Sequence, residues 1–473
     1  MRLVASFPLV PFLSAFLAIR EVALPLVSRL CLLMGVGIGL ASCSLFLALE
    51  TRLAPLLLDL AELALVLAIM RWRSPRRRRD GAVPQPRERW TALQFALLAV
   101  FLLLSALAAY YFVRVTLQDP HGKWDAWMIW NLKARYLVTD QWRAGFSAIN
   151  LWSHPDYPLL IPGIVARIWK AFDTLAPLAP QIVSGVFTLG VVALLVSSVT
   201  HYRGRTSGIL AGMALLGTAD FVGYGAWQCA DVPVSFFILA SLILLTEAEV
   251  ADSAALRLTC LGGLMAGMGA WTKNEGLLWI VAILIAVLGR AVFRGNTRRR
   301  LASGLAVLMG ALPILVIALI QKYDFHAPNP FLGHQSPGSM LVHLADAHRW
   351  KVLAIALGQE LSGFGGIAMG AFCFVVMAVG CMGIELDVHR RAIATAGGAL
   401  LVFLAGCCLV MVISPFQIEW QVRTAMTRVI IQIWPGILFL AFLALRNSRR
   451  DEPESAVVQS EGKAHQTSSA LPA

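Results

Sequence analysis

Long uninterrupted runs of apolar residues dominate the chain. Segments 30–49, 90–112, 183–200, 301–320 and 429–445 are examples, and each approaches the length at which a helix crosses about 30 Å of hydrocarbon. The alternating pattern of outer-membrane barrel strands is absent. Because a helix satisfies its backbone hydrogen bonds within one segment, helices are the expected form in lipid. The pattern predicts an all-α, polytopic transmembrane protein of about 11–13 spans with long extracytoplasmic loops.

Composition supports the same class. The 473 residues are 58% hydrophobic and 14% charged, which is more apolar surface than one soluble domain can bury. The net charge of +12 raises the alternative of nucleic-acid binding, but the basic residues form short clusters between apolar runs, as membrane topology requires. We therefore expect no nucleic-acid partner. The clusters should share the cytoplasmic side: 71–89, 201–205, 290–300, 389–391 and 446–450.

These features divide the chain into four parts. We expect N-terminal transmembrane helices over residues 1–70, a basic cytoplasmic loop over 71–89, a main transmembrane domain over 90–446 and a disordered cytoplasmic tail over 447–473. The tail is rich in polar residues and poor in apolar ones, a composition typical of disorder. Counting spans from the basic cytoplasmic loop places two long loops, about 114–157 and 321–350, outside the cytoplasm.

The outer loops concentrate the polar groups that the rest of the chain lacks. The first contains Lys123-Trp-Asp-Ala-Trp-Met-Ile-Trp-Asn-Leu-Lys-Ala-Arg135 and Ser153-His-Pro-Asp-Tyr-Pro158. If residues 124–135 form a helix, Trp127, Trp130 or Asn131, and Ala134 share one face. Asp125 then lies at the helix start, where a carboxylate is favoured but could serve only as an N-cap. The tryptophans suit an aromatic belt at the lipid interface as well as stacking on a sugar.

Several motifs together resemble a known family. They are Trp124-Asp-Ala-Trp127 with Lys133-Ala134, His154-Pro-Asp-Tyr-Pro158, Asp231-Val-Pro233, Thr272-Lys-Asn-Glu-Gly276, and Arg428 before Trp434-Pro435. In this order and spacing they resemble the bacterial GT-C glycosyltransferases, a superfamily that includes the protein O-mannosyltransferases and the lipid A aminoarabinose transferases. The resemblance covers residues 90–445, so the main domain is expected to be a GT-C-like catalytic domain.

The resemblance implies a function. Such enzymes transfer a hexose or pentose from a polyprenyl-phosphate carrier to an acceptor on the outer face of the membrane. The implied partners are a lipid-linked sugar donor, a glycan, lipid or protein acceptor, and membrane lipid. The implied location is the bacterial plasma (inner) membrane, with an active site that faces the periplasm or the exterior. The sugar and the acceptor stay open.

The reaction explains the residue types. Attack of an acceptor hydroxyl on an anomeric carbon needs a carboxylate to take the proton, and we expect Asp125 to be this catalytic base. Asp156 and Asp231 are the alternatives. Direct displacement with one base implies inversion of the anomeric centre. The phosphate leaving group needs cations, and we expect Lys273 and Arg428 to supply them near the bilayer boundary.

Each assignment has a structural alternative. Lys273 could form an ion pair with Glu275, and both Lys273 and Arg428 could extend toward the interface. His154 could be simply solvated rather than bind the phosphate or the acceptor. The expected substrate-binding set is Trp124, Trp127, Lys133, His154, Asp156, Tyr157, Asp231, Lys273, Glu275 and Arg428.

No cofactor and no metal ligand is assigned. Some family members use a divalent cation and carry paired acidic residues in the first outer loop, whereas here Ala126 follows Asp125. A divalent cation is therefore an open alternative. The histidines of the second outer loop match no metal-ligand spacing.

Three other functions fit many spans with polar outer loops. A transporter or flippase would place its polar groups on broken helices near the bilayer midplane. A polysaccharide polymerase or ligase would use oligosaccharides held on a lipid pyrophosphate. A noncatalytic membrane scaffold would need no convergence of its polar residues on one pocket.

Overall fold

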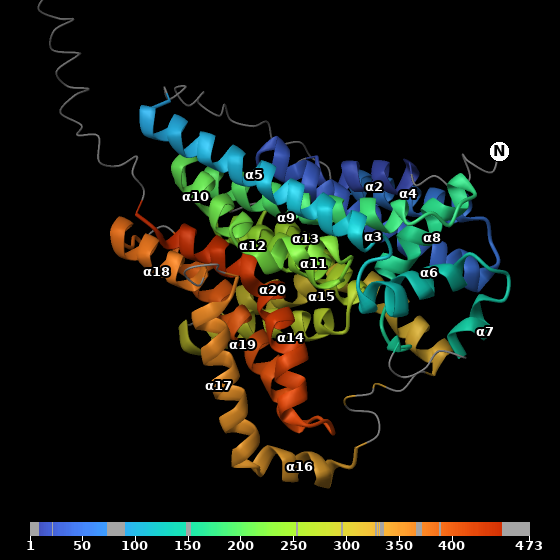
Figure 1. Ribbon diagram of the computed structural model, residues 1–473. Coiled ribbons are helices and arrows are strands. Elements are labelled where there is room, and N and C mark those ends of the chain that lie inside the picture. The colour runs from blue at the N-terminus through green and yellow to red at the C-terminus, as the bar shows by residue number, and fades with distance from the viewer. Residues whose placement is uncertain are drawn as a thin grey trace, which may run out of the picture.

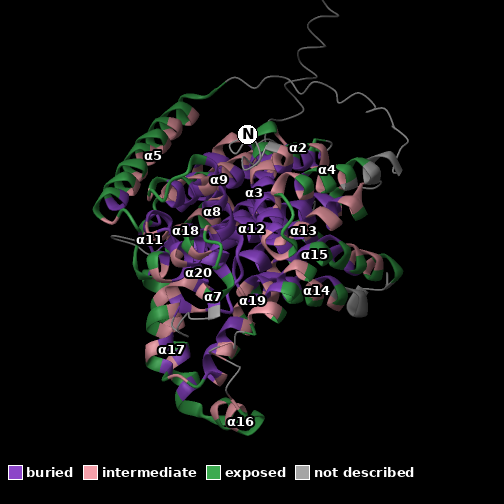
Figure 2. Cartoon of the chain, turned by 90° about the vertical axis from the view of Figure 1, so that its right-hand side faces the viewer, coloured by how far each residue is buried: buried purple, intermediate pink, exposed green. Residues whose placement is uncertain are grey.

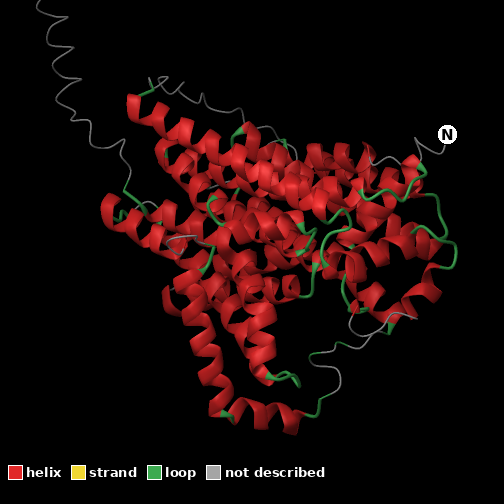
Figure 3. Cartoon of the chain, viewed as in Figure 1, coloured by secondary structure: helices red, strands yellow, loops and turns green. Residues whose placement is uncertain are grey.

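The computed structural model describes residues 9–446 apart from 21, 73–89, 148–152, 252–253, 295–296, 327–328, 330, 332–334, 366–370 and 387–388. Nearly all of the described chain is helical (Figure 3), and within it no strand occurs beyond an isolated bridge between Ile384 and Leu445. The all-α class predicted from the sequence is confirmed. Most of the predicted basic loop at 71–89, and all of the predicted tail at 447–473, lie outside the described residues.

Figure 1 shows the helices packed side by side. The first half of the chain forms α2 (Leu9–Ile19), α3 (Leu26–Thr51), α4 (Pro55–Trp72), α5 (Ala92–Gln118), the π-helical turn η1 (Ala126–Trp130), α6 (Asn131–Leu137), α7 (Trp142–Ser147), α8 (Leu160–Phe172), α9 (Leu178–Arg203), α10 (Arg205–Leu216) and α11 (Ala219–Ala226). The second half forms α12 (Asp231–Val250), α13 (Ala255–Thr272), α14 (Glu275–Arg294), α15 (Thr297–Phe325), α16 (Pro337–Ala345), α17 (Ala347–Gly363), α18 (Ala371–Met382), α19 (Arg390–Ile413) and α20 (Ile418–Ala444).

Among the described helices, seven are long and apolar enough to cross a membrane: α3, α5, α9, α12, α15, α19 and α20. The pair α10 and α11 is an eighth candidate if the 64° bend between them lies within one span. The sequence predicted about 11–13 spans because it also counted shorter or more polar apolar runs. Helices α13, α14 and α18 belong to that group. The chain is a multi-pass membrane protein.

Burial separates central helices from peripheral ones (Figure 2). The apolar window of α12 is buried throughout, whereas no part of the corresponding window of α5 is buried. Exposed leucines such as Leu93, Leu102 and Leu107 cover α5. Such a surface is unfavourable in water and suited to lipid. The first turn of α5 is stabilised by a capping box between Thr91 and Gln94. This motif satisfies the free backbone donors at the helix start and needs no contact with other helices.

The central helix α12 defines two ends of the bundle. Its 20 residues span about 30 Å at about 1.5 Å per residue, so Asp231 and Val250 lie at opposite ends. Near the Val250 end, Tyr202 donates a hydrogen bond to Glu247 at 2.7 Å, and Arg203 donates to the carbonyl of Leu443 at 2.8 Å. The basic segment at the end of α9 therefore meets the ends of α12 and α20.

Helices extend into both predicted outer loops. The first outer loop was predicted from residue 114, but α5 continues to Gln118. The second was predicted to span 321–350, but α15 continues to Phe325 and α17 begins at Ala347. The cause is the same in each case: polar residues at a helix end interrupt the apolar run, while the backbone stays helical. Gln321 is fully buried on α15 despite its polarity.

Candidate active site

Lys273 and Asn274, which separate α13 from α14, lie at the centre of the candidate site. Lys273 ends α13 with extended backbone (φ −156°, ψ 154°), and α14 starts at Glu275. The helices approach closely here, because a Cβ atom on Gly276 would overlap the backbone of Gly269. Glycine is therefore required at position 276. The motif fixes three consecutive polar side chains, 273–275, at the Asp231 end of the bundle.

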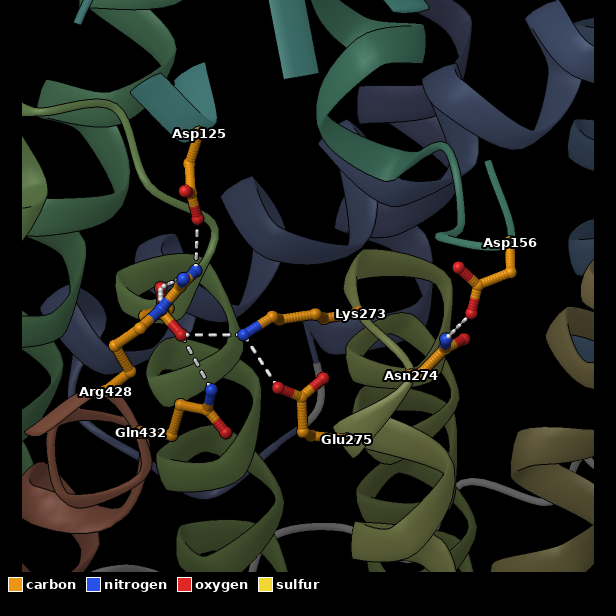
Figure 4. Close-up of polar contacts among 8 residues, drawn as sticks. Asp125, Asp156, Lys273, Asn274, Glu275, Arg428 and Gln432 are labelled. Atoms are coloured by element: carbon orange, nitrogen blue, oxygen red, sulfur yellow. Dashed lines mark hydrogen bonds and ion pairs between the residues drawn. The ribbon is translucent and has the colours of Figure 1, made fainter. Parts of the chain in front are cut away.

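Asp231 is the buried centre of the first cluster, and Figure 4 labels the side chains of Lys273, Arg428 and Gln432 that surround it. Its carboxylate is 0% exposed. Oδ1 accepts hydrogen bonds from Lys273 Nζ at 2.9 Å and from Gln432 Nε2 at 2.7 Å. Oδ2 accepts from Arg428 Nε at 3.1 Å and Nη2 at 3.0 Å. These donors supply the opposite charge and the hydrogen bonds that a buried carboxylate requires.

Each of the two cations also contacts a second carboxylate. Arg428 Nη2 lies 2.5 Å from Asp125 Oδ2, and Lys273 Nζ lies 2.7 Å from Glu275 Oε1. The side chains of Asp125 and Arg428 are 19% and 21% exposed, whereas Lys273 is 3% exposed. The cluster therefore has a buried floor, Asp231 and Lys273, and an accessible rim, Asp125, Arg428 and Glu275. With all groups ionised, carboxylates exceed cations by one.

Asp125 is positioned by an unusual helical turn. It directly precedes η1, its backbone is already helical, and its side chain makes no capping hydrogen bond. The N-cap alternative is therefore not realised, and the carboxylate points to Arg428 instead (Figure 4). Single π-helical turns are often found at functional sites.

The π-helical turn also corrects the predicted helix face. Trp127 was expected to share a face with Trp130 and Ala134, as in a regular helix. Trp130 and Ala134 are buried, but Trp127 is 49% exposed and Trp124 is 43% exposed. The wider turn of a π-helix changes the angle between successive side chains, so a 3.6-residue period no longer applies. Both exposed indoles flank Asp125 in the sequence.

A second cluster surrounds Asp156. Its Oδ2 accepts hydrogen bonds from Asn274 Nδ2 at 2.6 Å and Asn329 Nδ2 at 2.9 Å. Lys322 on α15 donates to the backbone carbonyl of Asp156 at 3.0 Å and to Asn274 Oδ1 at 2.9 Å. Burial raises the pKa of Asp156. Its Oδ1 is buried with no hydrogen-bond partner in the described part of the chain.

Stacked rings connect the two clusters. Trp130, Tyr157, His154 and Phe331 stack in that order, with centroid separations of 5.5, 4.4 and 5.9 Å. Lys273 Nζ lies 5.9 Å from the centroid of the Tyr157 ring, within the range of a cation–π contact. Burial raises the pKa of Tyr157 well above its ordinary value, so this ring stays neutral.

Lys133 holds the loop that carries these rings. It is fully buried on α6 and donates to the carbonyls of His154 at 2.5 Å and Tyr157 at 3.1 Å. Burial lowers the pKa of Lys133 to about 7. Burial, together with Lys133, Lys273 and Arg428, lowers the pKa of His154 to about 3. His154 is therefore a neutral imidazole at ordinary pH, not a cation.

The predicted site residues thus separate into three groups. Asp125, Asp231, Lys273, Glu275 and Arg428 form the first cluster. Lys133, His154, Asp156 and Tyr157 belong to the second cluster and its stacked rings. Trp124 and Trp127 are exposed, as either an interfacial belt or a stacking surface requires. The ion pair of Lys273 with Glu275, raised as an alternative from the sequence, is present.

Sequence reasoning missed four polar partners. Gln432 follows Arg428 by one helical turn on α20, so the i, i+4 spacing was a usable signal. Asn274 lies within a quoted motif but was given no role. Lys322 and Asn329 come from the end of α15 and the segment after it, and no local pattern points from them to Asp156.

A metal site is not formed by the described residues in this arrangement. They contain no group of three or more His, Cys, Asp or Glu side chains that could hold an ion. The carboxylates of the first cluster contact lysine and arginine instead.

Comparison with known proteins adds one structural likeness. No protein-family model matches the chain, and no curated protein matches it. The chain is similar to the crystal structure of ArnT from Cupriavidus metallidurans bound to undecaprenyl phosphate, with 14% sequence identity and a TM-score of 0.47. The match covers 80% of this chain and 64% of the ArnT chain, so this chain spans less than two thirds of that protein.

Proposed function

We propose that this protein is a membrane glycosyltransferase that transfers a hexose or pentose from a polyprenyl-phosphate carrier to an acceptor. The observation that carries the proposal is the contact between Asp125 and Arg428 at the rim of a buried ionic floor. A carboxylate and a guanidinium at one accessible point are the two groups that this reaction needs. The motifs that contain them resemble those of GT-C glycosyltransferases.

Asp125 is the proposed catalytic base. An acceptor hydroxyl attacks the anomeric carbon, its proton passes to the Asp125 carboxylate, and the bond from the anomeric carbon to the phosphate oxygen breaks. The electron pair of that bond leaves with the carrier phosphate. Attack from the face opposite the leaving group inverts the anomeric centre. The partial exposure of Asp125 and its freedom from a capping bond support this role.

Arg428 is the proposed phosphate ligand. Asp231 fixes its Nε and Nη2 atoms, so the guanidinium is oriented before a donor arrives. A carrier phosphate would replace Asp125 on the guanidinium, with charge-assisted hydrogen bonds of the kind that arginine makes to phosphate. The exchange would free the Asp125 carboxylate for the acceptor proton. One step would thus bind the donor and activate the base.

Lys273 is proposed to contribute positive charge from the buried floor of the first cluster. Its ammonium lies in the floor between Asp231 and Glu275, and it is nearly inaccessible. We assign it a stabilising positive charge near the leaving phosphate. Asp156 and His154 are proposed to line the acceptor side of the site. Asp156 is hydrogen-bonded to Asn274, the residue after Lys273. His154, a neutral imidazole, stacks on Tyr157, which Lys273 contacts. The exposed indoles Trp124 and Trp127 are proposed to stack on the sugar.

Location follows from the same proposal. The Asp231 end of the bundle would face the periplasm or the exterior of a bacterial inner membrane. The basic segments at the other end, including those near Arg203, would then lie in the cytoplasm, as the excess of arginine there favours.

The test is transfer of radiolabelled sugar from polyprenyl-phosphate donors in membranes. Asp125→Asn should lose transfer by about 10² to 10⁴-fold while folding normally. Asp119→Asn is the matched control, because Asp119 lies in the same loop and its ion pair within the described residues is with Lys123, not with a residue of the candidate site. Equal transfer by wild type and Asp125→Asn would remove Asp125 as the base. Absence of transfer from every donor tried would contradict glycosyl transfer itself.

A further inference from the structure

A cavity of about 480 Å³ opens at the end of the bundle opposite Asp231. Its walls come from the end of α12, the start of α13, the second half of α14, the start of α15 and Thr395 on α19. Glu249, near the end of α12, lies in its wall and is 18 positions from Asp231 on the same helix. At about 1.5 Å per residue this separates the cavity from the candidate active site by nearly the thickness of a bilayer. The cavity is therefore a separate site.

The charge of the cavity is positive. Arg298, Arg299 and Arg300 are consecutive in the first turn of α15 and all line it. Arg300 pairs with Glu249 at 2.8 Å, whereas Arg298 and Arg299 are exposed and form no ion pair within the described residues. Helix N-termini carry partial positive charge, so three arginines there repel the helix dipole. An anion in the cavity would offset this repulsion between the arginines and the helix dipole. The hydroxyl of Ser303, which also lines the cavity, could donate a hydrogen bond to the anion.

The surface beside the cavity is apolar. Leu256, on the wall, is 51% exposed. Leu301 and Leu305, one turn apart on α15 directly after the arginines, are 57% and 60% exposed. Leu308 and Leu312 continue the exposed face of the same helix. The anion site is thus continuous with a helix face that suits a hydrocarbon chain, and a soluble anion would leave this face unused.

We propose that this cavity binds the phosphate headgroup of an anionic phospholipid, with its acyl chains along the exposed leucines of α15. The unpaired arginines Arg298 and Arg299 contact the phosphate, and Arg300 stays with Glu249. Basic pockets between transmembrane helices are a recognised form of headgroup site. The volume is within the range of small-molecule sites, about 300–1,000 Å³. This proposal does not depend on the proposed glycosyl transfer.

The experiment is a lipid titration of the purified full-length protein in neutral detergent, followed by native mass spectrometry. The probes are dioleoyl phosphatidylglycerol, dioleoyl phosphatidylcholine and soluble glycerol 3-phosphate. Wild type should bind phosphatidylglycerol in preference to phosphatidylcholine. The double variant Arg298→Gln with Arg299→Gln should bind it on the order of 10- to 30-fold more weakly, the effect of two lost charges near a lipid phosphate.

A matched control is Arg390→Gln with Arg391→Gln. It also removes two exposed arginines at the start of a helix, α19, but these residues do not line the cavity. It should keep wild-type binding, and Arg298→Lys with Arg299→Lys should restore most of the preference by restoring charge. Equal binding by both glutamine variants would overturn the proposal. So would competition by glycerol 3-phosphate at lipid-like concentrations, which would indicate a soluble anion.

Discussion

Two buried aspartates, Asp231 and Asp156, lie on either side of the break between α13 and α14 and are held in different ways. Asp231 accepts from two cations and an amide, and both of its oxygens are paired. Asp156 accepts through one oxygen from two amides. Adjacent residues of one turn, Lys273 and Asn274, serve the two clusters separately.

The difference shows that the turn between α13 and α14 can take part in exchangeable ionic contacts through Lys273 and in fixed hydrogen bonds through Asn274. The Asp231 cluster has one cation, Lys273, in its buried floor and another, Arg428, at its rim beside the accessible Asp125 carboxylate, so it can exchange one anion for another. The Asp156 cluster ties α15, the 153–158 loop and the α13–α14 turn together with hydrogen bonds donated by Asn274, Asn329 and Lys322. Because amide contacts do not depend on bound anions, they can hold the turn while the ionic contacts change.

The largest expected effect is on Asp231. In Asp231→Asn the buried Lys273 and the guanidinium of Arg428 lose their shared counter-charge. Removing one partner of a buried ion pair typically costs about 3–5 kcal/mol. Chemical unfolding in detergent, followed by far-UV circular dichroism, would measure it. A loss no larger than that of Asp125→Asn, whose carboxylate is partly exposed, would mean that Asp231 is not the structural centre.

A smaller effect is expected at Asp156. Asp156→Ala removes one acceptor from Asn274 and Asn329 but keeps the backbone carbonyl that accepts from Lys322. The loss of this acceptor for two half-buried amide donors is expected to cost about 1–3 kcal/mol. The same unfolding measurement should rank Asp156→Ala below Asp231→Asn. The reverse order would mean that the amide contacts, rather than the ionic ones, dominate stability at this turn.

A further expected effect is a pH dependence of stability through Lys133. Its pKa is lowered from 10.5 to about 7, so above pH 7 the unfolded chain binds a proton that the folded protein has released. Stability should therefore rise with pH between about 7 and 10 and be independent of this group below 7. Lys133→Met should abolish that slope, as measured by thermal unfolding across this range. An unchanged slope would assign the titration to another group.

The sequence indicated which residues form the first cluster but not which of them contact one another. Asp125, Lys273 and Arg428 were expected to act together because a transfer reaction needs a base and phosphate-binding cations. That Asp231 would hold both cations could not be read from local pattern, since it depends on α12, α13 and α20 meeting at one point. The function of these residues stays a proposal.

The second cluster, around Asp156, shows more clearly which contacts cannot be predicted from the sequence. Asp156 was noticed within a motif, but its partners Lys322 and Asn329 lie more than 150 residues away in the chain. Only tertiary packing brings them together. Trp127 shows a different limit, because a π-helical turn alters the side-chain period on which the predicted face depended. The all-α class was predictable because long apolar runs in lipid leave helices as the expected form.

The most direct test of the account is the binding of undecaprenyl phosphate, without sugar, to Asp125→Asn and Arg428→Gln. If the carrier phosphate replaces Asp125 on Arg428, Asp125→Asn should bind it roughly 2- to 5-fold more tightly than wild type, because a competing partly exposed ion pair is gone. Arg428→Gln should bind it roughly 10- to 100-fold more weakly. Weaker binding by Asp125→Asn, or unchanged binding by Arg428→Gln, would contradict the proposed exchange at Arg428.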